Sequence, residues 1–263
     1  MKACEIASVF ETIAPISTGI ASDIENGFLG FRFGDRNVEV TGVGVAWFLS
    51  QEVVDAAVRK KLNMLIIHEP ELFRQYVSPF HSNMQAATIP FNLDKMKKLL
   101  EHDICVYTAH SNWDLQTQVG MAPTVAKALG FSDLIKWDIG IGVFRIGKTT
   151  LSGLIKHVKK CMKLAHVRFQ GRDDLPIKTV VLAYGSMGSE VEAILANNAD
   201  AGIFGELREW PFIFAREAGV GIIETTHVRS ESIGFASVVT ELHSRLPDVR
   251  IEFLEVPYPF RLA

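Results

Sequence analysis

The sequence predicts an α/β protein with mixed, mostly parallel sheets flanked by helices. Apolar segments of strand length alternate with segments of helical periodicity along the whole chain, which is the pattern of consecutive βα units. The 263 residues allow one large domain or two of ordinary size. No linker rich in Pro, Gly or Ser divides the chain, so its organisation has to follow from the elements themselves.

The first half opens with four apolar residues at helical spacing, Ile6, Val9, Phe10 and Ile13. Ser50 is a typical N-cap residue and stands directly before a helix-like segment. The expected helices span 3–15, 51–61, 93–102 and 123–129, the expected strands span 28–33, 38–47, 63–67 and 104–109, and residues 22–27 are expected to form a polar turn.

The second half continues the alternation. Gly130 follows the helix over 123–129 as a C-cap signal, and Ser189 and Glu192 have the spacing of a capping box. Gly185–Gly188 reads as a turn before that box, with phosphate binding as its less favoured reading. The expected helices span 150–162, 189–196, 210–218 and 230–246, and the expected strands span 179–184, 201–204, 220–225 and 251–254.

Both halves place the same polar pattern after their strands. In each half, one strand ends in two residues of which the second is Glu, namely His68-Glu69 and Gly205-Glu206. The next strand along the chain is followed by His-x-x-x-Asp in the first half and by His-x-x-x-Glu in the second. Functional groups of open α/β sheets gather at the carboxyl ends of strands, so we expect two similar lobes, 1–130 and 131–263, facing each other across a cleft. The residues with this placement are His68, Glu69, His110 and Asp114 in the first half and Glu206, His227 and Glu231 in the second.

Imidazoles and carboxylates are the ligands that Zn, Mn and Fe take in proteins. A His and a carboxylate four residues apart can meet at one ion, and adjacent residues of an extended segment point to opposite sides, so His68 and Glu69 could serve two neighbouring ions. The same residues also fit a plainer interpretation, in which polar side chains at strand ends are hydrogen bonded and bind nothing.

Five motifs then resemble a known family, the NIF-three-like dinuclear metal-centre proteins, also called GTP cyclohydrolase I type 2 homologues. The resemblance covers nearly the whole chain. The motifs are Leu65-Ile-Ile-His-Glu-Pro-Glu-Leu-Phe73, Ala109-His-Ser-Asn-Trp-Asp114, Tyr184-Gly-Ser-Met-Gly-Ser189, Ala199-Asp-Ala-Gly-Ile-Phe-Gly-Glu206 and Thr226-His-Val-Arg-Ser-Glu231.

The resemblance implies two related α/β lobes without an inserted middle domain, a homohexameric ring, and two divalent ions (Zn, Fe or Mn) in the cleft. It implies that His68 and His227 bind one ion, that residue 69 and Asp114 bind the other, and that Glu231 bridges them. This chain departs from the family pattern at Glu69, where relatives carry a second His. It also departs at Phe48 and Phe204, which stand for Asp and Thr and are expected to make the pocket more apolar.

Two functions from different classes follow. The first is a metal-dependent hydrolase of a small polar or cyclic substrate, with GTP ring opening as the reaction in the family's name and His110 and Glu206 as proton carriers. The second is a non-catalytic metal-binding or metal-handling scaffold that presents an interaction surface. A third outcome, an α/β protein without metal, follows if Glu69 dismantles the site.

The composition of the chain argues against some classes of binding partner. Lys and Arg number 27 against 30 Asp and Glu, a net charge of −3, which argues against a nucleic-acid partner. No run of 18 apolar residues predicts a membrane span, and residues 1–14 lack the apolar core of a signal peptide. The three cysteines, Cys4, Cys105 and Cys161, form no metal knuckle or disulfide pattern, so we expect a cytoplasmic protein.

Overall fold

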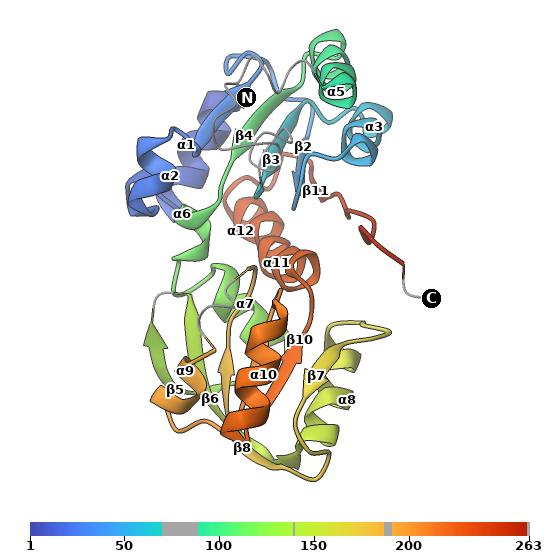
Figure 1. Ribbon diagram of the computed structural model, residues 1–263. Coiled ribbons are helices and arrows are strands. Elements are labelled where there is room, and N and C mark those ends of the chain that lie inside the picture. The colour runs from blue at the N-terminus through green and yellow to red at the C-terminus, as the bar shows by residue number, and fades with distance from the viewer. Residues whose placement is uncertain (70–88, 139, 187–190, 262–263) are drawn as a thin grey trace. The chain divides into compact units, whose positions relative to one another are not determined.

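The computed structural model describes residues 1–69, 89–138, 140–186 and 191–261. The chain forms two compact units, one of residues 1–116 and 235–263 and one of residues 117–234 (Figure 1). This division differs from the expected lobes 1–130 and 131–263, because the chain returns to the first unit at its C-terminal end. There, β11 (Ile251–Phe253) pairs in parallel with β2 (Val43–Ala46).

The first unit is built on a five-stranded sheet among its described residues. Its strands, in spatial order, are β1 (Gly30–Phe33), β4 (Cys105–Thr108), β3 (Met64–Ile67), β2 and β11. Only the pairing of β1 with β4 is antiparallel. Every residue of β2, β3 and β4 is buried, as expected for central parallel strands with both faces covered.

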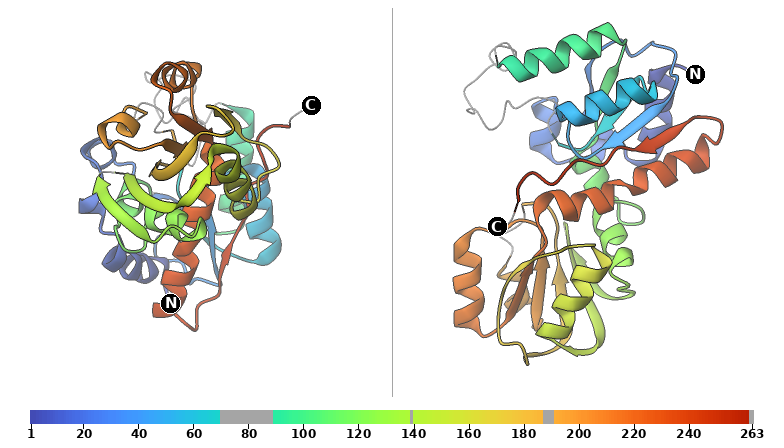
Figure 2. Two further views of the ribbon diagram at one scale, coloured as in Figure 1. Left: turned by 90° about the horizontal axis from the view of Figure 1, so that it is seen from below. Right: turned by 90° about the vertical axis from the view of Figure 1, so that its right-hand side faces the viewer.

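Helices cover both faces of this sheet. On one face α3 (Gln51–Lys60) and α5 (Pro90–Glu101) lie side by side (Figure 2) and contribute to one apolar cluster with the sheet. On the other face lies α1 (Ala3–Ile13), whose Phe10 contacts the rings of Tyr107 and Trp113 at 5.7 Å between centroids in both cases. Among its described residues, the unit also contains the helices α2 (Ala21–Glu25), α6 (Ser111–Asp114) and α12 (Ser237–Arg245) and the 3₁₀ turn η1 (Ile16–Thr18).

The second unit holds a six-stranded sheet among its described residues, in the order β5 (Asp133–Asp138), β6 (Ile141–Thr150), β8 (Pro176–Leu182), β9 (Ala201–Phe204), β10 (Gly221–Glu224), β7 (Arg168–Gln170). In this sheet β8 and β10 pair in parallel with β9. The other three pairings are antiparallel. The expected predominance of parallel pairing therefore holds in the first unit, whereas antiparallel pairs are in the majority in the second.

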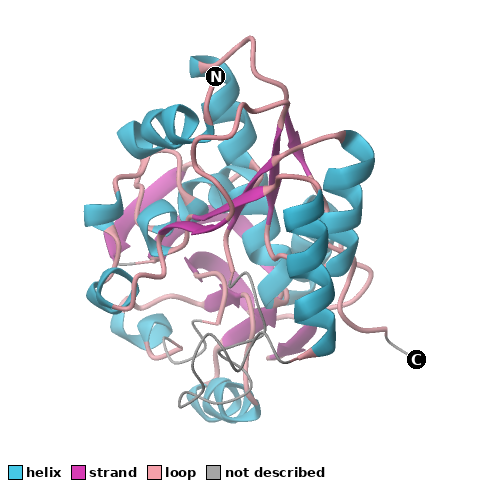
Figure 3. Cartoon of the chain, turned by 90° about the horizontal axis from the view of Figure 1, so that it is seen from above, coloured by secondary structure: helices cyan, strands magenta, loops and turns pink. Residues whose placement is uncertain are grey.

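Alternation along β8 distributes its side chains to two apolar clusters, one on each face of the sheet. Val180 and Leu182 pack with α7 (Met121–Ala128) and α8 (Leu151–Cys161), while Val181 and Ala183 join the cluster of α9 (Ala193–Ala196) and α10 (Glu209–Ala218). The last helix of the unit is α11 (His227–Phe235), whose final residue belongs to the first unit. Figure 3 shows the helices and strands of the chain by colour.

Two expected elements differ from the structure. Residues 22–27, expected to be a turn, are mostly helical, since α2 ends at Glu25. The single helix expected over 230–246 begins three residues earlier and is interrupted at Ala236, which keeps a helical φ of −59° and ψ of −23°. The earlier start is important, because it puts His227 on the first turn of a helix and not in a loop.

Part of the sequence interpretation falls on residues 70–88 and 187–190. The second half of the His68 motif and the capping residue Ser189 lie outside the described residues. Within the described part of the chain, no helix is both long enough and apolar enough to cross a membrane.

Candidate metal centre

The sheet of the first unit positions His68 and Glu69. Both follow β3 directly, and the parallel ladder continues through them, because the His68 amide donates to Ala46 O (3.2 Å) and the Glu69 amide to Trp47 O (2.8 Å). The backbone is therefore fixed where the two functional side chains begin. Both residues are buried, with 0% exposure for His68 and 6% for Glu69.

The next strand brings His110 and Asp114 to the same edge. The Ala109 amide donates to Ile67 O (2.8 Å), and His110 then caps the short helix α6, which carries Asp114. Nε2 of His68 lies 2.9 Å from Oδ1 of Asp114, and the rings of His68 and His110 are 4.8 Å apart. His68, Glu69 and His110 each offer one ligand atom, all within 4.8 Å of one another, so they form a group that could hold a metal ion.

Asp23 forms a hydrogen bond with the Nδ1 side of the His110 ring. Its Oδ2 accepts hydrogen bonds from Nδ1 of His110 (2.8 Å), from the amide of Ser111 (3.4 Å) and from the hydroxyl of Ser111. Burial by itself would raise the pKa of Asp23, but the bonds from His110 and Ser111 outweigh it and lower that pKa. Burial opposes the charged form of His110, but the hydrogen bond to Asp23 and the nearby carboxylates of Asp114 and Glu69 together outweigh it and raise the pKa of the imidazole.

The second unit carries a His–carboxylate group of its own. Nε2 of His227 lies 2.8 Å from Oε2 of Glu231, one helical turn further on, and Nδ1 lies 3.1 Å from Oε2 of Glu206. Glu231 is buried at 4% exposure, whereas the side chain of Glu206 is 58% exposed. His227 therefore joins a buried carboxylate, suited to hold an ion, to an exposed one, suited to exchange protons with solvent.

The backbone around His227 is shaped for this arrangement. Thr226 has a φ of +75°, an uncommon conformation for a β-branched residue, and it turns the chain from β10 into α11. Ser230 bridges this turn to Gly185, since its hydroxyl donates to His227 O (2.8 Å) and accepts from the Gly185 amide (3.0 Å). Gly185 O in turn accepts from the Glu206 amide (2.7 Å).

We expect Gly185→Ala to destabilise the second unit and weaken metal binding. A Cβ at Gly185 would lie 2.1 Å from Oε1 of Glu231, and its φ of +59° disfavours any side chain. Gly219→Ala is the matched control, because Gly219 has a similar φ of +71° but no atom within 4 Å of the added Cβ. Urea unfolding should show a loss of about 1–2 kcal/mol for Gly219→Ala and a larger loss for Gly185→Ala. Equal losses would contradict the proposed contact with Glu231.

The structure groups the sequence-predicted residues somewhat differently from the resemblance. His68, Glu69, His110 and Asp114 come together in the first unit, and Glu206, His227 and Glu231 come together in the second. His68 contacts Asp114, although the resemblance assigns these two residues to different ions. His110, expected to carry protons, also lies within ligand distance of His68 and Glu69.

The aromatic departures from the family pattern are not alike. Phe204 is fully buried in an apolar cluster with Ile222 and Ala215, so it is part of the core of the second unit. Phe48, at 8% exposure, lies under the ammonium group of Lys95, 5.5 Å from the ring centre. Sequence reasoning did not single out Asp23, which belongs to none of the five motifs, or Ser230, which lies within the Thr226–Glu231 motif, because their roles depend on contacts that form only on folding.

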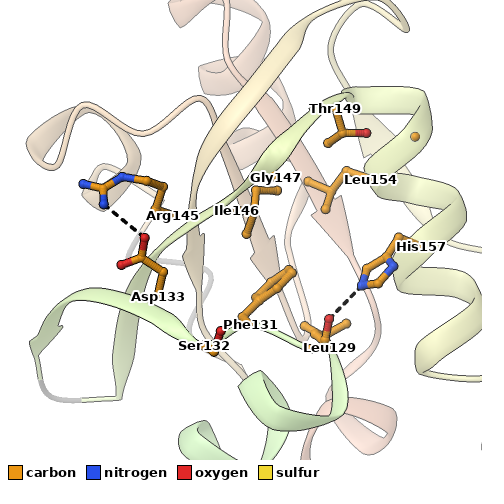
Figure 4. A pocket seen from close by; sticks show the side chains of 12 residues that line it. Leu129, Phe131, Ser132, Asp133, Arg145, Ile146, Gly147, Thr149, Leu154 and His157 are labelled. Atoms are coloured by element: carbon orange, nitrogen blue, oxygen red, sulfur yellow. Dashed lines mark hydrogen bonds and ion pairs between the residues drawn. The ribbon is translucent and has the colours of Figure 1, made fainter.

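A pocket of about 700 Å³ in the second unit involves none of these residues (Figure 4). It lies between β6, α8 and the segment after α7, over the apolar side chains of Phe131, Ile146 and Leu154. Its charged residues Asp133 and Arg145 pair with each other at 3.0 Å. This pocket is therefore lined by none of the candidate metal ligands.

The fold and the two His–carboxylate groups define a class, an α/β protein of two sheet-based units with a candidate metal-ligand set. The family model of Duf34/NIF3 (NGG1p interacting factor 3) matches residues 1–259. The chain therefore belongs to the Duf34/NIF3 family.

Curated relatives agree with this assignment. A protein of Clostridium acetobutylicum named GTP cyclohydrolase 1 type 2 homolog is 27% identical over 241 residues, covering 88% of this chain and 85% of the relative. A protein of the same name from Methanocaldococcus jannaschii is 27% identical over 250 residues, covering 94% of this chain and 96% of the relative.

Solved structures share the fold. A Bacillus cereus protein related to NIF3 has a TM-score of 0.86 at 16% identity, covering 100% of this chain and 99% of its own. The Staphylococcus aureus protein SA1388 has a TM-score of 0.83 at 21% identity with the same coverage.

Proposed function

We propose that the protein holds two divalent metal ions and is a metal-dependent hydrolase of a small polar or cyclic substrate. The ligands in this proposal are His68, Glu69, Asp114, His227 and Glu231, together with His110. The observation that carries the proposal is the gathering of imidazoles and carboxylates at buried strand ends in both units, in a chain that belongs to the Duf34/NIF3 family.

The donor set fits divalent ions. Burying a carboxylate is costly unless a cation or hydrogen bonds compensate it, and Glu69 and Glu231 are both almost fully buried. Two divalent ions bring a charge of +4, which the three ligand carboxylates of Glu69, Asp114 and Glu231 nearly balance. The mixture of imidazole nitrogen and carboxylate oxygen suits Zn, Fe or Mn.

Divalent ions lower the pKa of a bound water so that hydroxide is available near neutral pH. The side chains of the protein would hold the ions and move protons. Glu206 is exposed and bonded to Nδ1 of His227, so it can take a proton from that ring and pass it to solvent. Because curated relatives carry the name GTP cyclohydrolase 1 type 2 homolog, GTP ring opening is one of the reactions to test.

The test combines metal analysis with a turnover screen. Protein purified without added metal should contain a divalent ion by elemental analysis. Protein loaded with Mn, Fe or Zn is then assayed against GTP, other nucleotides, phosphoesters and cyclic amides, with Glu206→Gln as the variant expected to slow turnover and to keep metal. Metal binding without turnover of any substrate supports the scaffold function instead. Absence of metal after loading contradicts both.

We also propose a homohexamer. The support is the family resemblance alone, in which the ring assembly is common. Sedimentation velocity at micromolar concentration should give a single species of about six chains of 29.2 kDa. A stable monomer at that concentration contradicts the proposal.

A further inference from the structure

Asp23 is a buried acidic residue of the first unit that contacts the candidate ligand His110. It lies on the five-residue helix α2, far in sequence from the strand ends that carry the site. Its residue exposure is 9%, and the same oxygen, Oδ2, receives the bonds from His110 and Ser111. A buried carboxylate held in this way has a fixed orientation.

The hydrogen bond settles which nitrogen of His110 is engaged. A carboxylate only accepts, so Nδ1 of His110 carries the proton that faces Asp23. The edge of Phe28 also packs against the His110 ring at 5.2 Å, which restricts its rotation. With Nδ1 occupied, Nε2 is the atom left for the group that His110 forms with His68 and Glu69.

Ser111 also holds the Asp23 carboxylate in place. The Ser111 hydroxyl donates to Asp23 and accepts from the Ile20 amide (3.0 Å), which links the start of α2 to the start of α6. The Asp23 carboxylate is thus held by a hydrogen-bond network between two helices and not by a single side chain.

We infer that Asp23 is the positioning residue of His110: it fixes the tautomer with a proton on Nδ1 and presents Nε2 to the ion or substrate. Carboxylates that orient a ligating His commonly change metal affinity when they are removed. This inference rests on the proposed metal binding, but the tautomer itself is measurable in metal-free protein.

The test uses Asp23→Asn and Asp23→Ala. In Asp23→Asn the amide oxygen can still accept from Nδ1 and from the Ser111 amide, so this variant should keep the tautomer. Asp23→Ala removes the acceptor, so the ring proton can move to Nε2. Nitrogen-15 spectra of the neutral His110 ring in metal-free protein, assigned with His110→Ala, should show this change. Glu11→Gln is the matched control, since it alters a carboxylate that accepts a bond from buried Tyr107 (2.8 Å) in the same unit without touching His110.

Mn and Zn titrations provide the second readout. We expect Asp23→Ala to bind metal about 10–100-fold more weakly than wild type, Asp23→Asn to lose less affinity, and Glu11→Gln to bind normally. An unchanged tautomer in Asp23→Ala overturns the inference, and so does normal metal affinity in a variant with the altered tautomer. If wild type binds no metal but the tautomer shifts, the orienting role of Asp23 stands and the proposed metal function fails. Asp23→Leu, which also removes the acceptor, keeps the test valid if Asp23→Ala does not fold.

Discussion

The double variant His227→Ala, Glu231→Ala should lose its bound metal while it keeps its fold. The two side chains are 2.8 Å apart on one helical turn and form the proposed ligand pair of the second unit, in which Glu231 is buried. Alanine is a good helix former, so α11 should persist without them. Elemental analysis should find metal at background level in the variant, and far-ultraviolet circular dichroism should match that of wild type.

The chain offers a control of the same geometry. Glu241 and Arg245 also pair at a spacing of four residues, at 2.9 Å, on α12. Replacing both with Ala removes an ion pair of comparable length that is not part of the ligand set, so metal content should not change. If the His227, Glu231 variant retains the wild-type stoichiometry of metal, the assignment of these ligands is wrong.

Substitutions of Glu69 should change the metal preference of the site. The family resemblance implies a second His at position 69, and Glu69 is buried within reach of His68 and His110. A carboxylate is a harder ligand than an imidazole and favours Mn over Zn at that position. Glu69→His should therefore shift the preference toward Zn, and Glu69→Gln should weaken the binding of one ion.

Competition titrations with Mn and Zn measure this effect. The control is Glu25→Gln, which makes the same chemical change at an exposed position of the first unit. Metal binding to wild type should also raise thermal stability and release protons, because ligands must be deprotonated to bind. If neither Glu69 variant changes affinity or preference, Glu69 is not a ligand.

The local signals in the sequence were sufficient for the elements around the site. Ser50 caps α3 through a bond from the Val53 amide (3.3 Å), and the apolar segment 64–67 forms β3 with all four residues buried. The motifs that follow the strands also led to seven candidate residues that the structure collects into two groups. The candidates of each half lie near one another because parallel strands bring their carboxyl ends to one edge of a sheet; their role as ligands stays a prediction.

The hairpin of β5 and β6 was not predicted, although it supplies one edge of the second sheet. All of β5 is exposed or half-buried, so its side chains show little of the alternation that identifies a strand. Its pairing with β6 is also irregular between Leu134 and Lys136. The hydrogen bonds to β6, and not the hydrophobic pattern, keep this segment extended.

What the sequence determined by itself is the α/β class, the family and the identity of the candidate ligands, because each depends on residue type and short-range spacing. Tertiary structure decided which unit β11 joins, since β11 pairs with β2, about 200 residues earlier in the chain, and no local pattern encodes that partner. It also decided that Asp23 faces His110, because their contact joins residues 87 positions apart. A carboxylate in a short polar segment becomes a positioning group only when folding brings an imidazole to it.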